Sequence, residues 1–235
     1  SGAYGDELGF VRQTIAQSNQ YGSIVTDAAN AGSSNTGLYS GSNLSNQLSD
    51  IVSLISGGLE TKVYVATLGG FDTHAFQTEN NDPTQGDHAN LLADLSSSIA
   101  AFQADLEEQG LADRVLGMTF SEFGRQIRSN QSTGTDHGTA APLFLFGNCV
   151  QGSILGNSPA LDANIDVGEG VPMQYDFRDI YASVMVDWFG LPDSTVRNLL
   201  YANYTYLPIV NGCAALPVEW LSFAATAQRD RVILE

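Results

Sequence analysis

A chain of 235 residues, 43% of them hydrophobic, is long enough to bury one sizeable core and falls within the range of a single large α/β domain. Its 26 acidic and 9 basic residues give a net charge of −17, which argues against nucleic acid and anionic membranes as partners. The sequence has no apolar run of about 18 residues, so we expect no membrane span. The same charge would repel a phosphate or sulfate ester unless a bound cation reversed it locally.

Two helices are predicted in the first quarter of the chain. Apolar residues recur at helical spacing over residues 7–17 and again over residues 44–55, where Gly57 ends the second helix. The stretch over residues 36–45 is rich in Gly, Ser and Asn and predicts a loop. Neither helix carries a chemical motif, so functional residues are expected further along the chain.

A strand, a helix and a second strand are predicted next. Residues 61–68 (TKVYVATL) and 114–120 (RVLGMTF) have the β-branched and aromatic content of strands, and apolar spacing over residues 92–106 predicts a helix between them. Elements of these lengths form a right-handed βαβ unit with parallel strands. The apolar run 142–146 (PLFLF) follows too closely for another crossover helix, so we expect that strand to run antiparallel.

The last third of the chain predicts further helices. Asp176 is expected to cap a helix that ends at Gly190, and residues 194–200 predict a shorter one. No internal repeat, low-complexity tract or domain boundary is visible. We therefore expect residues 1–235 to form one α/β domain, with a mostly parallel sheet flanked by helices.

Histidines and carboxylates follow the predicted strands. All 3 histidines lie between residues 62 and 138, each near acidic residues. Asp72 and His74 come after the first strand and Glu122 after the second, and the carboxyl ends of parallel strands share the sheet edge at which ligands bind. The antiparallel third strand would begin at the same edge and bring Asp136 and His137 beside them.

These side chains predict a metal site. Carboxylate oxygen together with imidazole suits zinc, manganese or iron(II), so the expected ligands of a divalent cation are Asp72, His74, Glu122, Asp136 and His137. Glu122 is also a candidate general base, and Arg125 a candidate for neutralising an oxyanion. The plainer alternatives are that Asp72 caps a turn and that Glu122 pairs only with Arg125.

Three other residues each have two interpretations. His88 either faces the site and supports the ligands from behind, or faces solvent while Asp87 caps the helix. The only cysteines, Cys149 and Cys213, are not spaced as a zinc pair or a redox motif. They either form one disulfide in an oxidising compartment or remain two separate buried thiols.

Three motifs carry a family resemblance. GGFDTH (69–74), SEFGR (121–125) and GTDHG (134–138), with the stretch 176–190, resemble the bacterial domain of unknown function 1501 family, a branch of the alkaline phosphatase and sulfatase-like superfamily. The resemblance covers roughly residues 45–195. It implies a three-layer α/β sandwich and an exported protein, whether secreted, periplasmic or at the cell surface.

The resemblance also implies roles for residues. Asp72 and His74 would answer to the superfamily's first pair of metal ligands, Glu122 to the Asp of the second pair, and His137 to the last ligand. Phe123 stands where a further His is expected, a departure that puts a second metal in doubt. The family's N-terminal part, with the first strand and the nucleophile, is expected to precede this chain and to pair with its sheet edge, as the other half of the same protein or as another copy.

Two functions from different classes follow. The first is an exported, metal-dependent hydrolase of phosphate or sulfate esters. The second is a non-catalytic extracellular or cell-surface protein that keeps the fold and works in a homo-oligomer or larger assembly. A glycan- or protein-binding module is a third interpretation, for which Trp188 and the 9 tyrosines offer no clustered signal.

Overall fold

The computed structural model describes residues 3–159, 161–162, 164–200 and 203–211, and the backbone of residues 225–228 and 231–234. Its contacts divide the chain into two compact units. Unit 1 comprises Ser1–Ala112, Ser121–Pro142 and Ala160–Pro172, and unit 2 comprises Asp113–Phe120, Leu143–Pro159 and Met173–Glu235. The single domain over residues 1–235 stays a prediction.

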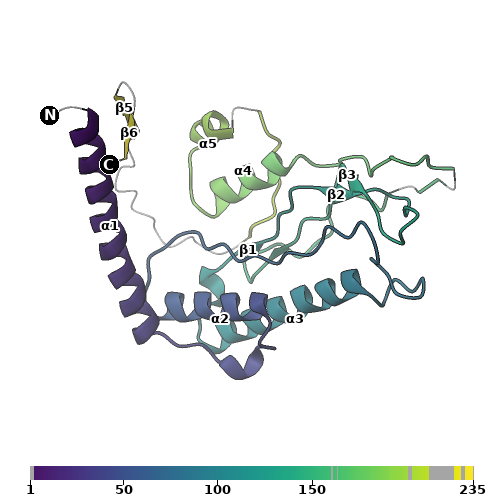
Figure 1. Cartoon of the computed structure of the whole chain (residues 1–235), viewed down its shortest axis with the longest axis horizontal. Helices are drawn as coiled ribbons and strands as arrows, with labels where there is room; N and C mark the ends of the chain where they lie inside the picture. Colours follow the sequence, from purple (N-terminus) through teal and green to yellow (C-terminus); the bar gives the residue numbers. More distant parts are fainter. Residues whose placement is uncertain are drawn as a thin grey trace. The chain divides into compact units, whose positions relative to one another are not determined.

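Helices form the frame of unit 1. They are α1 (Ala3–Ala31), the short 3-10 helix η1 (Thr36–Leu38), α2 (Asn43–Ser56) and α3 (Asp87–Glu108). Helix α2 packs against both α1 and α3 (Figure 1), and its Val52 is fully buried, as is Leu106 of α3. The predictions for residues 44–55 and 92–106 are confirmed, because amphipathic spacing is a local property of the sequence. No described helix is long and apolar enough to cross a membrane.

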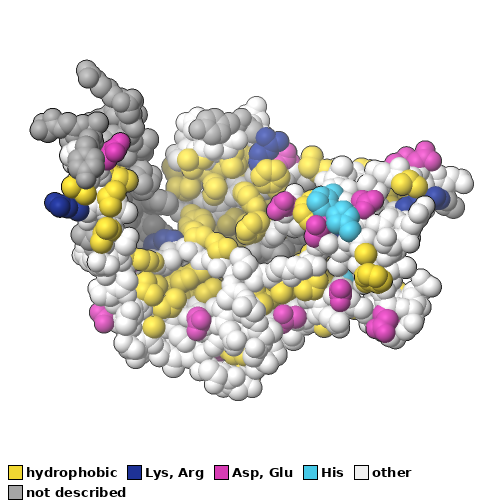
Figure 2. All heavy atoms as spheres, viewed as in Figure 1, with side chains coloured by type: hydrophobic (Ala, Val, Ile, Leu, Met, Phe, Trp, Pro, Cys, Tyr) yellow, Lys and Arg dark blue, Asp and Glu magenta, His cyan; other side chains and the backbone are white. Residues whose placement is uncertain are grey.

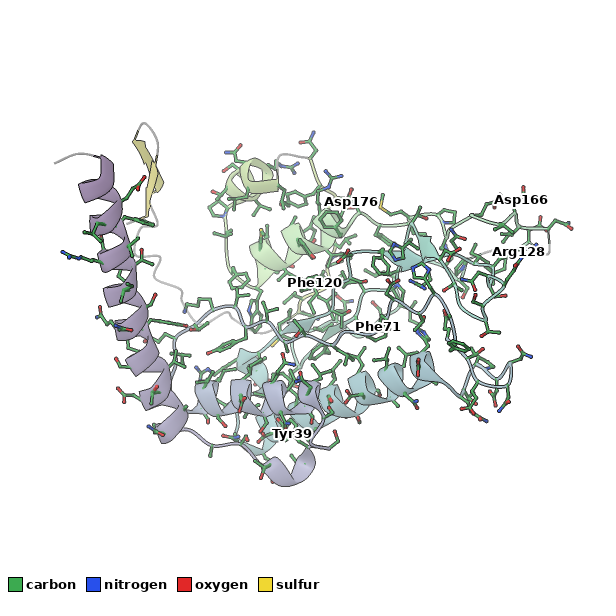
Figure 3. All side chains as sticks on the ribbon, in the orientation of Figure 1. Tyr39, Phe71, Phe120, Arg128, Asp166 and Asp176 are labelled. Carbon is green, nitrogen blue, oxygen red and sulfur yellow. The ribbon has the colours of Figure 1, made fainter. Side chains whose placement is uncertain are left out.

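A buried carboxylate joins the loop before α2 to helix α3. Asp105 is fully buried and accepts hydrogen bonds from the Tyr39 hydroxyl at 3.0 Å, the Asn35 backbone N–H at 3.1 Å and the Gln109 side-chain amide at 2.8 Å. Figure 3 labels Tyr39 at this junction. Burial, followed by the hydrogen bond to Asp105, raises the pKa of Tyr39, so the phenol remains a proton donor.

The predicted parallel sheet and three-layer sandwich are wrong. The described strands pair as three separate two-stranded antiparallel sheets, with neighbours β1–β4, β2–β3 and β5–β6. The strands are β1 (Gly117–Met118), β2 (Gly124–Arg125), β3 (His137–Gly138), β4 (Leu145–Phe146), β5 (Ala225–Gln228) and β6 (Arg231–Leu234). The antiparallel direction predicted for residues 142–146 is confirmed locally, because β4 runs antiparallel to β1.

Residues 61–68 show why the fold prediction failed. This stretch has the composition of a strand, but the structure assigns it no strand, and Val63 and Val65 are 65% and 64% exposed. Strand propensity mainly expresses how well side chains fit a half-buried pleated surface. Composition therefore identified a stretch that suits a sheet without showing which segment would pair with it.

Unit 2 has two small hydrophobic clusters. Helices α4 (Phe177–Asp187) and α5 (Asp193–Leu200), both predicted, meet through the fully buried Ala182 and Val196. A second cluster centres on Val184 and Leu207, with Leu145 of β4 packed against it. Cys149 is also fully buried in this unit. Cys213 lies outside the described residues, so the disulfide stays a prediction.

Replacing Asp176 with alanine is expected to destabilise α4 by about 1 kcal/mol, because the Asp176 side chain accepts a hydrogen bond from the Arg178 backbone N–H at 2.9 Å and caps the helix. Hydrogen bonds from Arg178 also lower the pKa of Asp176 from 3.8 to about 2. The ionised carboxylate therefore contributes stability above about pH 4, and this contribution is lost as the pH falls through about 2. Urea unfolding of both proteins between about pH 7 and pH 2 measures the difference.

The control for this prediction is Asp50→Ala, which removes an exposed carboxylate from α2. That variant should unfold within about 0.5 kcal/mol of the parent protein. A difference between Asp176→Ala and the parent that did not shrink at low pH would contradict the role given to the Asp176 charge.

Candidate metal centre

Two antiparallel contacts in unit 1 build the scaffold of the site. Residues 73–77 run beside residues 132–135, with backbone bonds from Phe76 N to Ser132 O at 3.1 Å and from Thr135 N to Thr73 O at 3.2 Å. Strands β2 and β3 also pair, with Arg125 opposite His137. These pairings bring residues 72–74, 125 and 136–137 to one place, although no parallel sheet is involved.

Gly134 permits the first of these contacts. A Cβ atom at this position would lie 2.3 Å from the His74 carbonyl carbon and 2.5 Å from the Thr73 oxygen. Both neighbours are backbone atoms and cannot rotate away as a flexible side chain could. The approach of residues 132–135 to His74 therefore requires a residue without a side chain.

Replacing Gly134 with alanine is expected to destabilise the protein by about 2 kcal/mol, because the added methyl group forces the two segments apart. Since His74 moves with its backbone, metal affinity should fall as well. Thermal unfolding and titration with a divalent metal measure the two effects. The matched control is Gly69→Ala, where an added Cβ meets nothing within 4 Å. Equal behaviour of the two variants would contradict the prediction.

One carboxylate oxygen is the centre of the cluster. Asp72 Oδ1 lies 3.0 Å from His74 Nε2, 2.8 Å from His137 Nε2 and 2.8 Å from Arg125 Nη1. One donor atom from each of Asp72, His74 and His137 lies within 4.8 Å of the other two, and all three side chains are about half exposed. Figure 2 shows histidine side chains gathered on the surface with acidic side chains beside them.

Asp136 is hydrogen-bonded to His74 through Nδ1, the ring nitrogen that does not face Asp72. Its Oδ1 lies 2.9 Å from His74 Nδ1 and accepts a hydrogen bond from Asn130 Nδ2 at 3.1 Å. With Nδ1 bonded to Asp136, the Nε2 atom of His74 is the one presented to Asp72. The hydrogen bond from His74, followed by that from Asn130, lowers the pKa of Asp136 and keeps it ionised. Asp136 lies outside the converging donor group, so in this structure it orients a ligand.

The Arg125 side chain donates its hydrogen bonds to neighbouring residues of the protein. The side chain is 18% exposed, and its Nε donates to Thr135 Oγ1 at 3.0 Å while another nitrogen donates to the Thr135 carbonyl. Its Nη1 bonds Asp72, and this contact, followed by that of His137, lowers the pKa of Asp72. In this arrangement Arg125 positions Asp72. Binding of an oxyanion by Arg125 stays a prediction.

Phe123 supports His137. The two rings are stacked with centroids 3.7 Å apart and an interplanar angle of 14°. The Arg125 guanidinium lies 5.7 Å from the centroid of the same phenyl ring. The residue that stands in place of an expected histidine therefore sets the orientation of another ligand. Nothing in the local sequence indicated this contact.

Glu122 and His88 do not belong to the donor group, which consists of Asp72, His74 and His137. Glu122 is exposed and is not among the described residues whose donor atoms converge. His88 lies at the start of α3, where Gly86 occupies the N-cap position. Its ring is nearly perpendicular to that of Phe71, labelled in Figure 3, with the ring centroids 6.0 Å apart. Its Nδ1 is buried without a hydrogen-bond partner in the described part of the chain. Burial, followed by the charge of Arg125, lowers the pKa of His88.

The donor set suits a divalent transition metal. Two imidazole nitrogens and one carboxylate oxygen are common ligands of zinc, manganese and iron(II), and a carboxylate behind a ligating histidine is the usual second partner. Ligands about 2.0–2.2 Å from zinc lie roughly 3.3 Å from one another. The Asp72 to histidine distances of 2.8 and 3.0 Å are a few tenths shorter, a difference that half-exposed side chains can absorb by rotation. The residues present therefore fit a metal ion.

Comparison with known protein families finds a match that covers these motifs. The family model described as "Protein of unknown function (DUF1501)" matches residues 51–191, which include every residue of the cluster. No curated protein and no solved structure matches the chain.

Proposed function

Since the chain belongs to the DUF1501 family, whose function is unknown, we propose from the site itself that it is a metal-dependent hydrolase of phosphate or sulfate esters. The observation that carries this proposal is the convergence of Asp72, His74 and His137 on one exposed point. We place the family as a branch of the alkaline phosphatase and sulfatase-like superfamily, and the protein outside the cytoplasm, on the resemblance of its motifs. The metal would be zinc, manganese or a similar divalent ion.

To bind an anionic ester, this acidic protein needs a positive charge at the site. A divalent ion held there would supply Lewis-acid chemistry toward an ester oxygen. Asp72, His74 and His137 would hold it, while Asp136 keeps His74 Nε2 turned toward the same point. Because three nitrogens surround Asp72 Oδ1, the repulsion of an anionic ester by that carboxylate is reduced.

Glu122 is the proposed proton acceptor. It is exposed and directly precedes Phe123, whose ring stacks on His137. A carboxylate at this position can take a proton from an attacking water without serving as a ligand. In this assignment Glu122 is a general base and, contrary to the prediction from the sequence, not a metal ligand.

Metal loading followed by turnover tests the proposal. The intact protein should bind about one zinc or manganese ion and hydrolyse para-nitrophenyl phosphate or sulfate. His74→Ala should abolish both properties, because it removes a ligand. The matched control is His88→Ala, which removes the one histidine outside the donor group. No stoichiometric metal, or equal turnover by His74→Ala and the parent, would overturn the proposal.

The second candidate is a non-catalytic extracellular or assembly protein that keeps the fold and has lost the chemistry. Phe123 favours it, because an aromatic ring occupies the position of an expected ligand and stacks on His137. A protein that forms a stable assembly, binds no stoichiometric metal and turns over neither ester would support this alternative over the hydrolase.

A further inference from the structure

Two buried threonines lie beside the metal ligands. Thr73 belongs to the first ligand segment, residues 72–74, and Thr135 belongs to the second, residues 135–137. Thr73 is 6% exposed and Thr135 is 8% exposed, so water has little access to their hydroxyl groups. A buried hydroxyl needs a hydrogen-bond partner within the protein, because leaving it unpaired costs free energy.

One side-chain oxygen, Gln77 Oε1, joins the two threonines. It accepts a hydrogen bond from Thr73 Oγ1 at 3.0 Å and another from Thr135 Oγ1 at 2.7 Å. An amide oxygen has two lone pairs, and both are used in these bonds. Gln77 therefore links the first ligand segment to the second.

Arg125 fixes the direction of this link. Its Nε can only donate, and it donates a hydrogen bond to Thr135 Oγ1 at 3.0 Å. The single hydrogen of the Thr135 hydroxyl is therefore directed to a different acceptor, which is Gln77 Oε1. Arg125 Nη1 in turn donates to Asp72 Oδ1 at 2.8 Å. The hydrogen bonds thus connect Gln77 through Thr135 and Arg125 to a metal ligand.

The Gln77 backbone is anchored on both sides within unit 1. Its N–H donates to the Thr133 carbonyl at 3.1 Å, and its carbonyl accepts from the His88 N–H at 3.3 Å. His88 lies at the start of α3, so this second bond ties Gln77 to one of the long helices. The Gln77 side chain therefore extends from a fixed position.

A metal centre built from two segments depends on the spacing between them. Asp72 and His74 come from the first ligand segment and His137 from the second, and their donor atoms lie within 4.8 Å of one another. Metal–ligand distances vary by only about 0.2 Å in a well-formed site. A shift of one segment against the other would therefore move donors out of reach of the metal.

We propose that Gln77 is a positioning residue of the metal centre. It acts through Thr73 and Thr135 and holds the two ligand segments at the spacing that a metal ion requires. The proposal rests on the proposed function in one respect, which is that the donor group binds metal.

The zinc affinity of the folded protein tests this role. Gln77→Met removes the shared acceptor and should weaken zinc binding by about tenfold, the lower end of the range for residues that orient metal ligands. The matched control is Gln47→Met on α2, which removes a side-chain amide that bonds the Thr67 backbone N–H and carbonyl, each at 2.9 Å. This control should bind zinc as the parent protein does. A purely structural role would lower stability in both variants and leave zinc affinity unchanged in both.

Thr135 supplies a second pair of variants. Thr135→Val removes the hydroxyl and should also weaken zinc binding, whereas Thr135→Ser keeps a hydroxyl and should bind zinc as tightly as the parent. Because Gln77 and Thr135 act as one unit, the double variant Gln77→Met, Thr135→Val should lose less affinity than the product of the two single losses. Fully multiplicative losses, or equal zinc affinity of Gln77→Met and the parent, would overturn the proposal.

A measurement without metal separates this role from the proposed function. The Thr135 N–H is bonded to the Thr73 carbonyl at 3.2 Å, so its hydrogen exchange reports how firmly the two ligand segments are held together. In the metal-free protein this exchange should be about tenfold faster in Gln77→Met than in the parent or in Gln47→Met. Unchanged exchange would overturn the role of Gln77 whether or not the parent binds zinc. Faster exchange in a protein that binds no zinc would overturn the metal centre and uphold Gln77 as the link between the segments.

Discussion

Replacing His137 with alanine is expected to weaken zinc binding by more than about 100-fold, because only one imidazole and one carboxylate of the donor group remain. His137 is about half exposed, so the loss should come without unfolding. Competition against a chelating dye at neutral pH measures the affinity, and circular dichroism checks the fold. His88→Ala is the matched control and should bind zinc as the parent does.

Asp136→Asn distinguishes a supporting residue from a ligand. If Asp136 orients His74 through Nδ1, zinc affinity should fall by about 10–100-fold, less than for His137→Ala. The amide still offers an oxygen to His74, but it lacks the charge. Equal losses in the two variants would contradict the role assigned to Asp136, and no loss in either would contradict the metal centre.

Replacing Asp105 with alanine is expected to lower the free energy of unfolding by about 3 kcal/mol. The carboxylate is fully buried and accepts from the Tyr39 hydroxyl, the Asn35 backbone and the Gln109 amide. The first two lose this acceptor, whereas the Gln109 amide keeps its hydrogen bond to the Ser33 carbonyl. Leaving buried donors unpaired costs about 1–3 kcal/mol, and more for groups that bonded a charge. Urea unfolding at neutral pH measures the change.

Tyr39→Phe is a milder variant to compare with Asp105→Ala. It removes one of the three donors and leaves the carboxylate with two, so a loss of about 1 kcal/mol is expected. Asp50→Ala, an exposed change on α2, should have almost no effect. A loss below about 1 kcal/mol for Asp105→Ala would show that the junction contributes little to stability.

Prediction of the fold succeeded for helices and failed for the sheet. The helices over residues 44–55 and 92–106 were recognisable because their apolar faces repeat within a few residues of one another. Residues 61–68 have strand composition but no assigned strand. Strand pairing joins segments far apart in the chain, and nothing inside residues 61–68 specifies a partner.

Prediction of the site was correct about proximity but assumed the wrong scaffold. Asp72 and His74 do lie beside His137, but antiparallel contacts of residues 132–135 and of β2–β3 bring them together, and no shared edge of parallel strands is involved. The sequence predicts Glu122 as a metal ligand because it follows a predicted strand. The structure leaves it exposed and outside the donor group.

The sequence by itself determined the helices, the acidic surface and the residue types of the cluster, because these depend on composition and short-range spacing. Only the tertiary structure decided which atoms meet. It placed Asp136 behind His74, turned Arg125 onto Asp72 and stacked Phe123 on His137. Each of these contacts depends on backbone pairing between loops, which side-chain periodicity does not encode.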